Sequence, residues 1–228
     1  MFVEVDDRPR LELRWATPLI VVGSIVLAFW ELSLDLETRQ RFIRSWGTVP
    51  AELLDFDDPG SAWRGPLRLF SALFIHADGW HLAGNMLFLL LFGMGVERVF
   101  RSRWCVFLFL VCGALANLVT AWVFKGVSAP IIGSSGAVSA LIGAYLYLFP
   151  RARLGVVLPL GLYFQFVRVP AQHLIGLWLL LQVLYTVATP DLSAVAWLAH
   201  VVGFIAGFVL AIALRPLILR KVRMPRLQ

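Results

Sequence analysis

Two small polar clusters lie inside apolar segments of this chain, and their residue types could do nucleophilic chemistry. Gly133-Ser134-Ser135-Gly136 stands at the head of an apolar run that ends at Pro150, and His200 lies within a second apolar run. Polar and ionisable groups are costly in hydrocarbon, so their presence there points to a function. A serine hydroxyl beside a neutral imidazole forms a nucleophile with its general base. The sequence therefore predicts Ser135 as a nucleophile and His200 as its base.

The composition is that of a protein that crosses a membrane several times. Of the 228 residues, 60% are hydrophobic and only 15% are charged, and the mean hydropathy is +0.81. A helix needs about 20 apolar residues to cross a bilayer. Runs near that length occur at residues 16–32, 80–96, 104–124, 134–149, 170–188 and 193–214. We therefore expect an all-α polytopic membrane protein, a bundle of six transmembrane helices with a long, partly helical first outer loop at about 33–79.

The basic residues indicate which ends of the spans face the cytoplasm. Arginines and lysines cluster before the first run, between the second and third, between the fourth and fifth, and after the sixth. Six spans place all four clusters on one side, which the positive-inside rule assigns to the cytoplasm. The predicted divisions are a cytoplasmic tail at 1–15, the membrane domain at 16–214 and a basic cytoplasmic tail at 215–228.

The distribution of charge also indicates which partners and which membrane to expect. The net charge of +6 is spread over topology-determining loops that contact anionic lipids, and we expect no nucleic-acid partner. The compact six-span form without an added targeting segment favours a bacterial cytoplasmic membrane with both termini cytoplasmic. The apolar stretch 154–167 is too short to span and is broken by Pro159 and Gly161, so we expect an interfacial hairpin or a re-entrant segment there.

Four candidate site residues converge in depth near the outer face. The second span enters from outside with His81 and Asn85, which lie four residues apart on one helical face. The fourth span is short, so Ser135 at its start lies below the outer surface. The sixth span places His200 about two turns down from the same side. These four side chains are therefore predicted to lie at a similar depth.

Glycines predict that the fourth and sixth spans lie close together. Gly203 and Gly207 follow His200 on its own helical face, in a small-xxx-small pattern that allows two backbones to approach closely. The fourth span offers small residues in return, at Gly133, Gly136, Ala140, Gly143 and Ala144. A hydrogen bond of about 2.6–3.2 Å between two short side chains, as expected for Ser135 and His200, needs such close helices.

These groups suggest how a peptide bond could be attacked. An apolar site disfavours imidazolium, so a neutral His200 can accept the Ser135 proton. Donors for the oxyanion are the backbone of Ser135 at the start of its helix, together with Asn85 and His81. No acidic residue lies within the fourth or sixth span, and the sequence therefore predicts a dyad without a third, orienting carboxylate.

Three motifs together resemble those of one family. Gly133-Ser134-Ser135-Gly136 is similar to the Gly-x-Ser-Gly of rhomboid intramembrane serine proteases, Ala199–Gly203 with Gly207 resembles their histidine helix, and His81–Asn85 resembles their His-xxx-Asn. The resemblance covers about residues 64–212. It implies a six-helix rhomboid fold, Ser135 as nucleophile, His200 as base, Asn85 and His81 at the oxyanion, transmembrane protein substrates and no cofactor.

One departure concerns the residue a turn after the nucleophile. The family often has an aromatic side chain there, packed on the histidine, whereas this chain has Ser139. The orientation of the His200 ring then depends on another neighbour, which the sequence does not identify.

Other readings of the same residues are open at this stage. Ser134 is by default a helix cap, and Asn117 and Gln182 are interhelical hydrogen-bonding groups. His76, His81 and His200 could bind zinc, although the first two do not share a helical face. A non-catalytic rhomboid-like protein that binds membrane clients, or a transporter, would be alternatives of another class; a transporter would show internal repeats, and none is evident.

Overall fold

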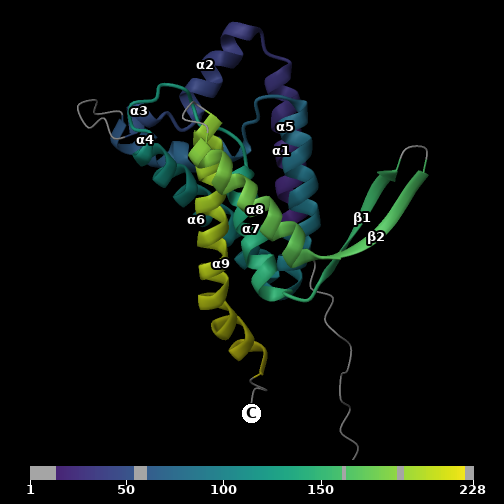
Figure 1. The fold of residues 1–228 in the computed structure, drawn as a ribbon. Helices are drawn as coiled ribbons and strands as arrows, with labels where there is room; N and C mark the ends of the chain where they lie inside the picture. The colour runs from purple at the N-terminus through teal and green to yellow at the C-terminus, as the bar shows by residue number, and fades with distance from the viewer. Residues whose placement is uncertain (1–13, 54–60, 161–162, 189–192, 224–228) are drawn as a thin grey trace, which may run out of the picture.

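The computed structural model describes residues 14–53, 61–160, 163–188 and 193–223. Helices make up nearly all of it, and a single hairpin projects from one end (Figure 1). The elements in chain order are α1 (Ala16–Leu32), α2 (Leu36–Trp46), α3 (Pro50–Leu53), α4 (Ser61–Ser71), η1 (Ala72–Phe74), α5 (Gly79–Phe88), η2 (Leu89–Gly93), α6 (Met94–Val123), α7 (Ser135–Leu148), β1 (Arg153–Leu160), β2 (Tyr163–Pro170), α8 (Ala171–Ala188) and α9 (Ser193–Arg223).

The apolar stretch Gly79–Val123 is two rods rather than one. Arg101 has a φ of 69°, outside the helical region, and the chain turns there. The Cys105 thiol lies 3.9 Å from the carbonyl oxygen of Gly93, twelve residues earlier, whereas a straight helix would separate them by about 18 Å. Within the described residues, the bundle therefore consists of α1, a rod from α5 through η2 and α6 up to Arg101, the part of α6 after Arg101, α7, α8 and α9.

These rods begin and end close to the predicted runs. Ala16–Leu32 coincides with the first run, and Ser135–Leu148 and Ala171–Ala188 match the fourth and fifth within one residue at each end. Gly79–Val123, Ala171–Ala188 and Trp197–Ile218 are long and apolar enough to cross a membrane, and α1 and α7 are shorter apolar helices. The last helix continues to Arg223, beyond the predicted end of the sixth run.

The hairpin is the departure from an all-helical fold. Strands β1 and β2 pair antiparallel, with Arg153 opposite Pro170 and Leu160 opposite Tyr163. They extend away from the helices, as Figure 1 shows. The stretch 154–167, predicted as an interfacial hairpin or a re-entrant segment, thus lies in a β-hairpin whose two strands hydrogen-bond to each other.

The first loop is partly helical, as predicted, and it is fixed to the segment that precedes α7. Thr48 and Ile131 exchange two backbone hydrogen bonds, of 3.0 and 2.8 Å. Arg68 donates to the carbonyl of Ser45 and to the carboxylate of Glu52, joining α4 to the end of α2 and to α3. The loop therefore holds the start of α7 in place from outside the bundle.

Glu97 closes the other end of the bundle by capping α1. Its Oε1 accepts from the backbone of Ala16 at 2.8 Å and from Ser102 Oγ at 2.6 Å, and its Oε2 accepts from the backbone of Thr17 at 2.9 Å. These two N–H groups belong to the first turn of α1, which has no intrahelical acceptors for them. A carboxylate there also interacts favourably with the helix dipole.

His76 anchors the segment between η1 and α5. Its side chain is buried, with 2% exposed, and Nδ1 donates to the carbonyl of Phe74 while Nε2 accepts from Ser134 Oγ at 3.3 Å. Burial, with a smaller effect from the nearby His81, lowers the pKa of His76 from 6.5 to about 4. The neutral ring is thus a structural link between this segment and the start of α7.

Replacing Glu97 tests the cap on α1. In Glu97→Gln one amide edge can only donate, so one backbone N–H of α1 loses its acceptor. We expect a loss of about 2 kcal/mol of unfolding free energy, seen as a thermal unfolding midpoint lower by about 4–8 °C in detergent. Arg98→Gln, at the exposed neighbouring position, is the control and should leave the midpoint within a degree or so. An unchanged midpoint in Glu97→Gln would contradict the capping role.

The pH dependence of stability tests the neutral state of His76. Between about 4 and 6.5 the unfolded chain binds a proton at His76 that the folded chain does not, so stability is full above 6.5 and falls as the pH drops toward 4. We expect the unfolding midpoint of His76→Gln to fall less than that of the wild type between about pH 7.5 and about pH 5. His173→Gln, at an exposed position of α8, should behave as the wild type. Equal pH dependence in all three proteins would show that His76 is not held neutral.

Candidate active site

Gly133 allows the chain to enter α7 beside the ring of His81. Its φ is +111°, a conformation that favours glycine, and its backbone N–H donates to the carbonyl of Ala72 at 2.9 Å. A Cβ at this position would lie 2.6 Å from Cε1 and 2.7 Å from Nε2 of His81. Both the backbone angle and the neighbouring ring therefore require glycine.

Ser135 is the first residue of α7, at the position where a helix has unpaired N–H groups and the positive end of its dipole. Ser134 occupies the cap position, but its side chain makes no capping hydrogen bond and is instead bonded to His76. The default role of Ser134 as a side-chain cap is therefore wrong. The reason is that the buried ring of His76 competes for its hydroxyl.

The backbones of α7 and α9 are in contact at glycines. A Cβ added to Gly203 would lie closer than 3.0 Å to the carbonyl oxygen of Gly136, and one added to Gly207 would meet the carbonyl of Ala140 in the same way. On the other helix, a Cβ on Gly143 would collide with the carbonyl of Phe204. Hence α9 lies against α7 with no side chain between them at these points.

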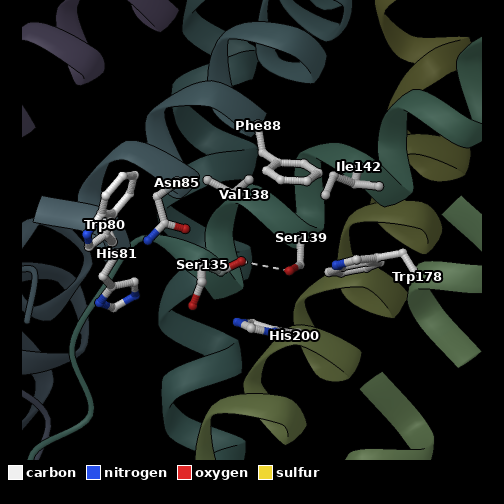
Figure 2. A pocket seen from close by; sticks show the side chains of 11 residues that line it. Trp80, His81, Asn85, Phe88, Ser135, Val138, Ser139, Ile142, Trp178 and His200 are labelled. Carbon is white, nitrogen blue, oxygen red and sulfur yellow. Dashed lines mark hydrogen bonds between the residues drawn. The ribbon is translucent and has the colours of Figure 1, made fainter. Parts of the chain in front are cut away.

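One pocket collects the four predicted polar residues. The cavity has a volume of about 230 Å³ and is shown in Figure 2. In that view the Ser135 side chain and the His200 ring lie next to each other. The pocket is lined by Trp80, His81, Gly84, Asn85, Phe88, Ser135, Val138, Ser139, Ile142, Trp178 and His200. Helices α5, α7, α8 and α9 thus all contribute to it.

The expected direct hydrogen bond between Ser135 and His200 is not formed. Among the hydrogen bonds between described residues, the one made by the ring runs from Nδ1 to Oε1 of Gln182, at 2.6 Å. Catalytic hydrogen bonds are often long until a substrate is bound. Ser135 and His200 thus line the same pocket without a direct hydrogen bond, and the His200 ring is held by Gln182 through Nδ1.

Three side chains surround the His200 ring. Trp178 of α8 stacks on it with a centroid distance of 6.2 Å and an interplanar angle of 29°, and Trp197 meets it edge to face at 5.8 Å. Gln182, one turn after Trp178, completes the set. The aromatic side chain packed on His200 is therefore Trp178 of α8 rather than a residue at position 139. Ser139 Oγ donates to the carbonyl of Ser135 at 2.7 Å.

Sequence reasoning missed Trp178 as a site residue and treated Gln182 only as an interhelical link. A signal for them was present: the two residues lie four apart in one apolar run, so they share a helical face.

Two side chains of α5 can donate into the pocket. Asn85 is 8% exposed, and its Nδ2 has no hydrogen-bond partner among the described residues. His81 accepts at Nδ1 from the backbone of Ala77 at 3.4 Å, which leaves Nε2 protonated on the side of Gly133. Asp78 caps α5 by accepting from the backbone of His81, and that hydrogen bond lowers the pKa of Asp78.

The geometry does not favour the zinc alternative. Both ring nitrogens of His76 and one of His200 are engaged by protein groups. Within the described part of the chain, no group of three or more His, Cys, Asp or Glu side chains is placed to hold a metal ion.

Comparison with known proteins gives the family. The model of the Rhomboid domain matches residues 60–217, more than half of the chain. Rhomboid protein 1, mitochondrial, of Saccharomyces cerevisiae is 28% identical over 92 residues, which are 39% of this chain and 27% of the yeast protein.

Two vertebrate proteins align over longer stretches. Presenilin-associated rhomboid-like protein A, mitochondrial, of Danio rerio is 27% identical over 145 residues (62% of this chain, 34% of that protein), and Presenilin-associated rhomboid-like protein, mitochondrial, of Mus musculus is 25% identical over 146 residues (63% and 35%). The chain spans about a third of the length of these relatives. With several apolar helices and this domain match, the chain is an integral multi-pass membrane protein and belongs to the rhomboid family.

Proposed function

We propose that this protein is an intramembrane serine endopeptidase that uses a Ser135–His200 dyad. The observation that carries the proposal is the shared pocket: Ser135 at the start of α7 and His200 on α9 line one cavity with Asn85, whose Nδ2 has no hydrogen-bond partner among the described residues. Membership of the rhomboid family, which mostly comprises serine proteases, supports it.

The proposed reaction uses groups already in the pocket. His200 takes the hydroxyl proton of Ser135 as Oγ attacks the carbonyl carbon of a peptide bond. The carbonyl oxygen becomes an oxyanion that Asn85 Nδ2, His81 Nε2 and the backbone N–H of Ser135 can stabilise. His200 then gives the proton to the leaving amine nitrogen, and the C–N bond breaks. A water molecule then gives a proton to His200 as its oxygen attacks the acyl carbon; the bond from that carbon to Oγ breaks, and His200 returns the proton to Ser135.

The substrates we propose are transmembrane segments of other proteins. The pocket lies between apolar helices, and Trp80 at its edge is 90% exposed. We further propose that the rods are six membrane spans with both termini cytoplasmic, because the basic clusters then share one side. The bacterial cytoplasmic membrane is part of the same proposal, while the names of the three relatives place those proteins in mitochondria.

A non-catalytic client-binding protein of the same fold is the alternative from another class. Such a protein would need no serine and histidine in one pocket and no unpaired donor beside them. Both features are present, and they favour the protease.

Removing either member of the dyad tests the proposal. Purified protein in detergent is incubated with a tagged single-span membrane protein, and cleavage is followed by gel. We expect cleavage by the wild type, at most about 10⁻³ of that rate in Ser135→Ala and His200→Ala, and covalent labelling of Ser135 by a fluorophosphonate in the wild type only. Ser33→Ala, far from the pocket in sequence and exposed, serves as the control. Equal cleavage by all variants would refute the dyad.

The role of Asn85 is tested separately. Asn85→Ala removes one of the donors proposed for the oxyanion but leaves the nucleophile and base, so we expect kcat to fall by about 10²–10³ with KM changed little. Labelling of Ser135 by the fluorophosphonate should persist at a reduced rate. A variant in which KM rises and kcat stays constant would show that Asn85 binds substrate rather than the transition state.

A further inference from the structure

Within the described part of the chain, His200 makes one hydrogen bond, with an amide from the neighbouring helix. Nδ1 of the ring and Oε1 of Gln182 are 2.6 Å apart. Gln182 is buried, with 5% exposed, inside the apolar run of α8. A buried polar side chain in such a run has a cost that a specific partner must offset. The partner here is the imidazole that the proposed reaction needs.

The direction of this hydrogen bond decides which nitrogen can act as base. An amide carbonyl oxygen only accepts, so Nδ1 must carry the proton. In a neutral imidazole the other nitrogen, Nε2, then has the free lone pair. Figure 2 shows a ring nitrogen of His200 turned toward Ser135. The opposite tautomer would place a proton on the nitrogen that has to take one.

The ring is also fixed in orientation. Trp178 stacks on one face of His200 and Trp197 approaches edge to face, while Gln182 holds Nδ1. Because Trp178 and Gln182 lie one turn apart on the same side of α8, a single helix supplies both contacts. No acidic side chain is needed for this arrangement.

From this geometry we propose that Gln182 is a positioning residue that holds His200 in the Nδ1-protonated tautomer, with Nε2 directed to Ser135. The inference rests on the proposed protease function. In the transition state the same carbonyl dipole stabilises the imidazolium that forms, without placing a charge in the membrane.

The test uses the protein of residues 1–228 and three variants. Gln182→Met keeps the length and shape of the side chain but removes the acceptor. Gln182→Glu restores an acceptor with the same reach. Gln172→Met makes the same exchange at an exposed position of the same helix and serves as the matched control. Thermal unfolding of each variant shows whether it is folded.

The readouts are the pH profile of kcat/KM for a tagged single-span substrate and the rate of fluorophosphonate labelling of Ser135. We expect Gln182→Met to lose about ten- to a hundredfold in both rates, the range for a hydrogen bond to a charged group. Its acid limb should move to lower pH, because the imidazolium loses a partner. Gln182→Glu should recover activity and move the acid limb to higher pH, and Gln172→Met should match the wild type.

The side chains around His200 allow a shift of the acid limb to be assigned to position 182. Among the described residues, His81 on α5 is the titratable side chain that lines the same pocket as His200. Helices α6, α7 and α8 present the uncharged Asn117, Ser135 and Gln182. His81 is the same in all variants, so differences between profiles report on position 182. Nitrogen-15 spectra of histidine-labelled protein give the tautomer directly, with Nε2 unprotonated in the wild type and a mixture in Gln182→Met.

The outcomes separate this inference from the proposed function. Cleavage that persists in Ser135→Ala would remove the protease proposal itself. Wild-type rates and an unchanged profile in Gln182→Met would overturn the role of Gln182 alone. Loss of activity in Gln182→Met with an unchanged acid limb, an unchanged tautomer and no recovery in Gln182→Glu would also overturn it, because a purely structural role predicts that combination.

Discussion

The contact between α7 and α9 without intervening side chains is the constraint on which the site depends. Between helices in a membrane there is no hydrophobic driving force, and close packing of small residues replaces it. Gly203 against the backbone of Gly136, and Gly207 against that of Ala140, set the separation of the two helices. Because serine and histidine side chains are short, this separation decides whether Ser135 and His200 can share one pocket.

Around this contact, polar links hold each side of the pocket in place. The first loop is hydrogen-bonded to the segment before α7 through Thr48 and Ile131. The segment between η1 and α5 is hydrogen-bonded to the start of α7 through His76 and Ser134. Asn85 is the contrast, because its buried Nδ2 has no partner among the described residues. An unpaired buried donor lowers stability. Such a cost at the edge of the pocket fits the proposed role at an oxyanion, for which a donor must be in place before charge develops.

Much of the fold follows from local features of the sequence, whereas the surroundings of His200 do not. The length of apolar runs predicts α1, α7 and α8 closely, and the motif spacing places Ser135, Asn85 and His81 on helix faces that meet in one pocket. Trp178 and Gln182 depend on how α8 is rotated about its axis. Packing against α9 sets that rotation, and the hydropathy of the sequence does not predict it. The hydrogen bond of Ser134 to the buried ring of His76, 58 residues earlier in the sequence, likewise depends on tertiary packing.

The nature of the His200 partner matters for a protein in a membrane. A carboxylate at position 182 would stabilise imidazolium more strongly, but it would bring a charge into an apolar run. The buried carboxylates of the described residues lie near the ends of α1 instead: Glu97 of α6 accepts from its first turn, and Glu31 lies near its last residue, beside Arg39. An amide oxygen accepts the same Nδ1 proton and carries no net charge. The neutral partner thus fixes the ring while leaving α8 apolar enough to lie in the bilayer.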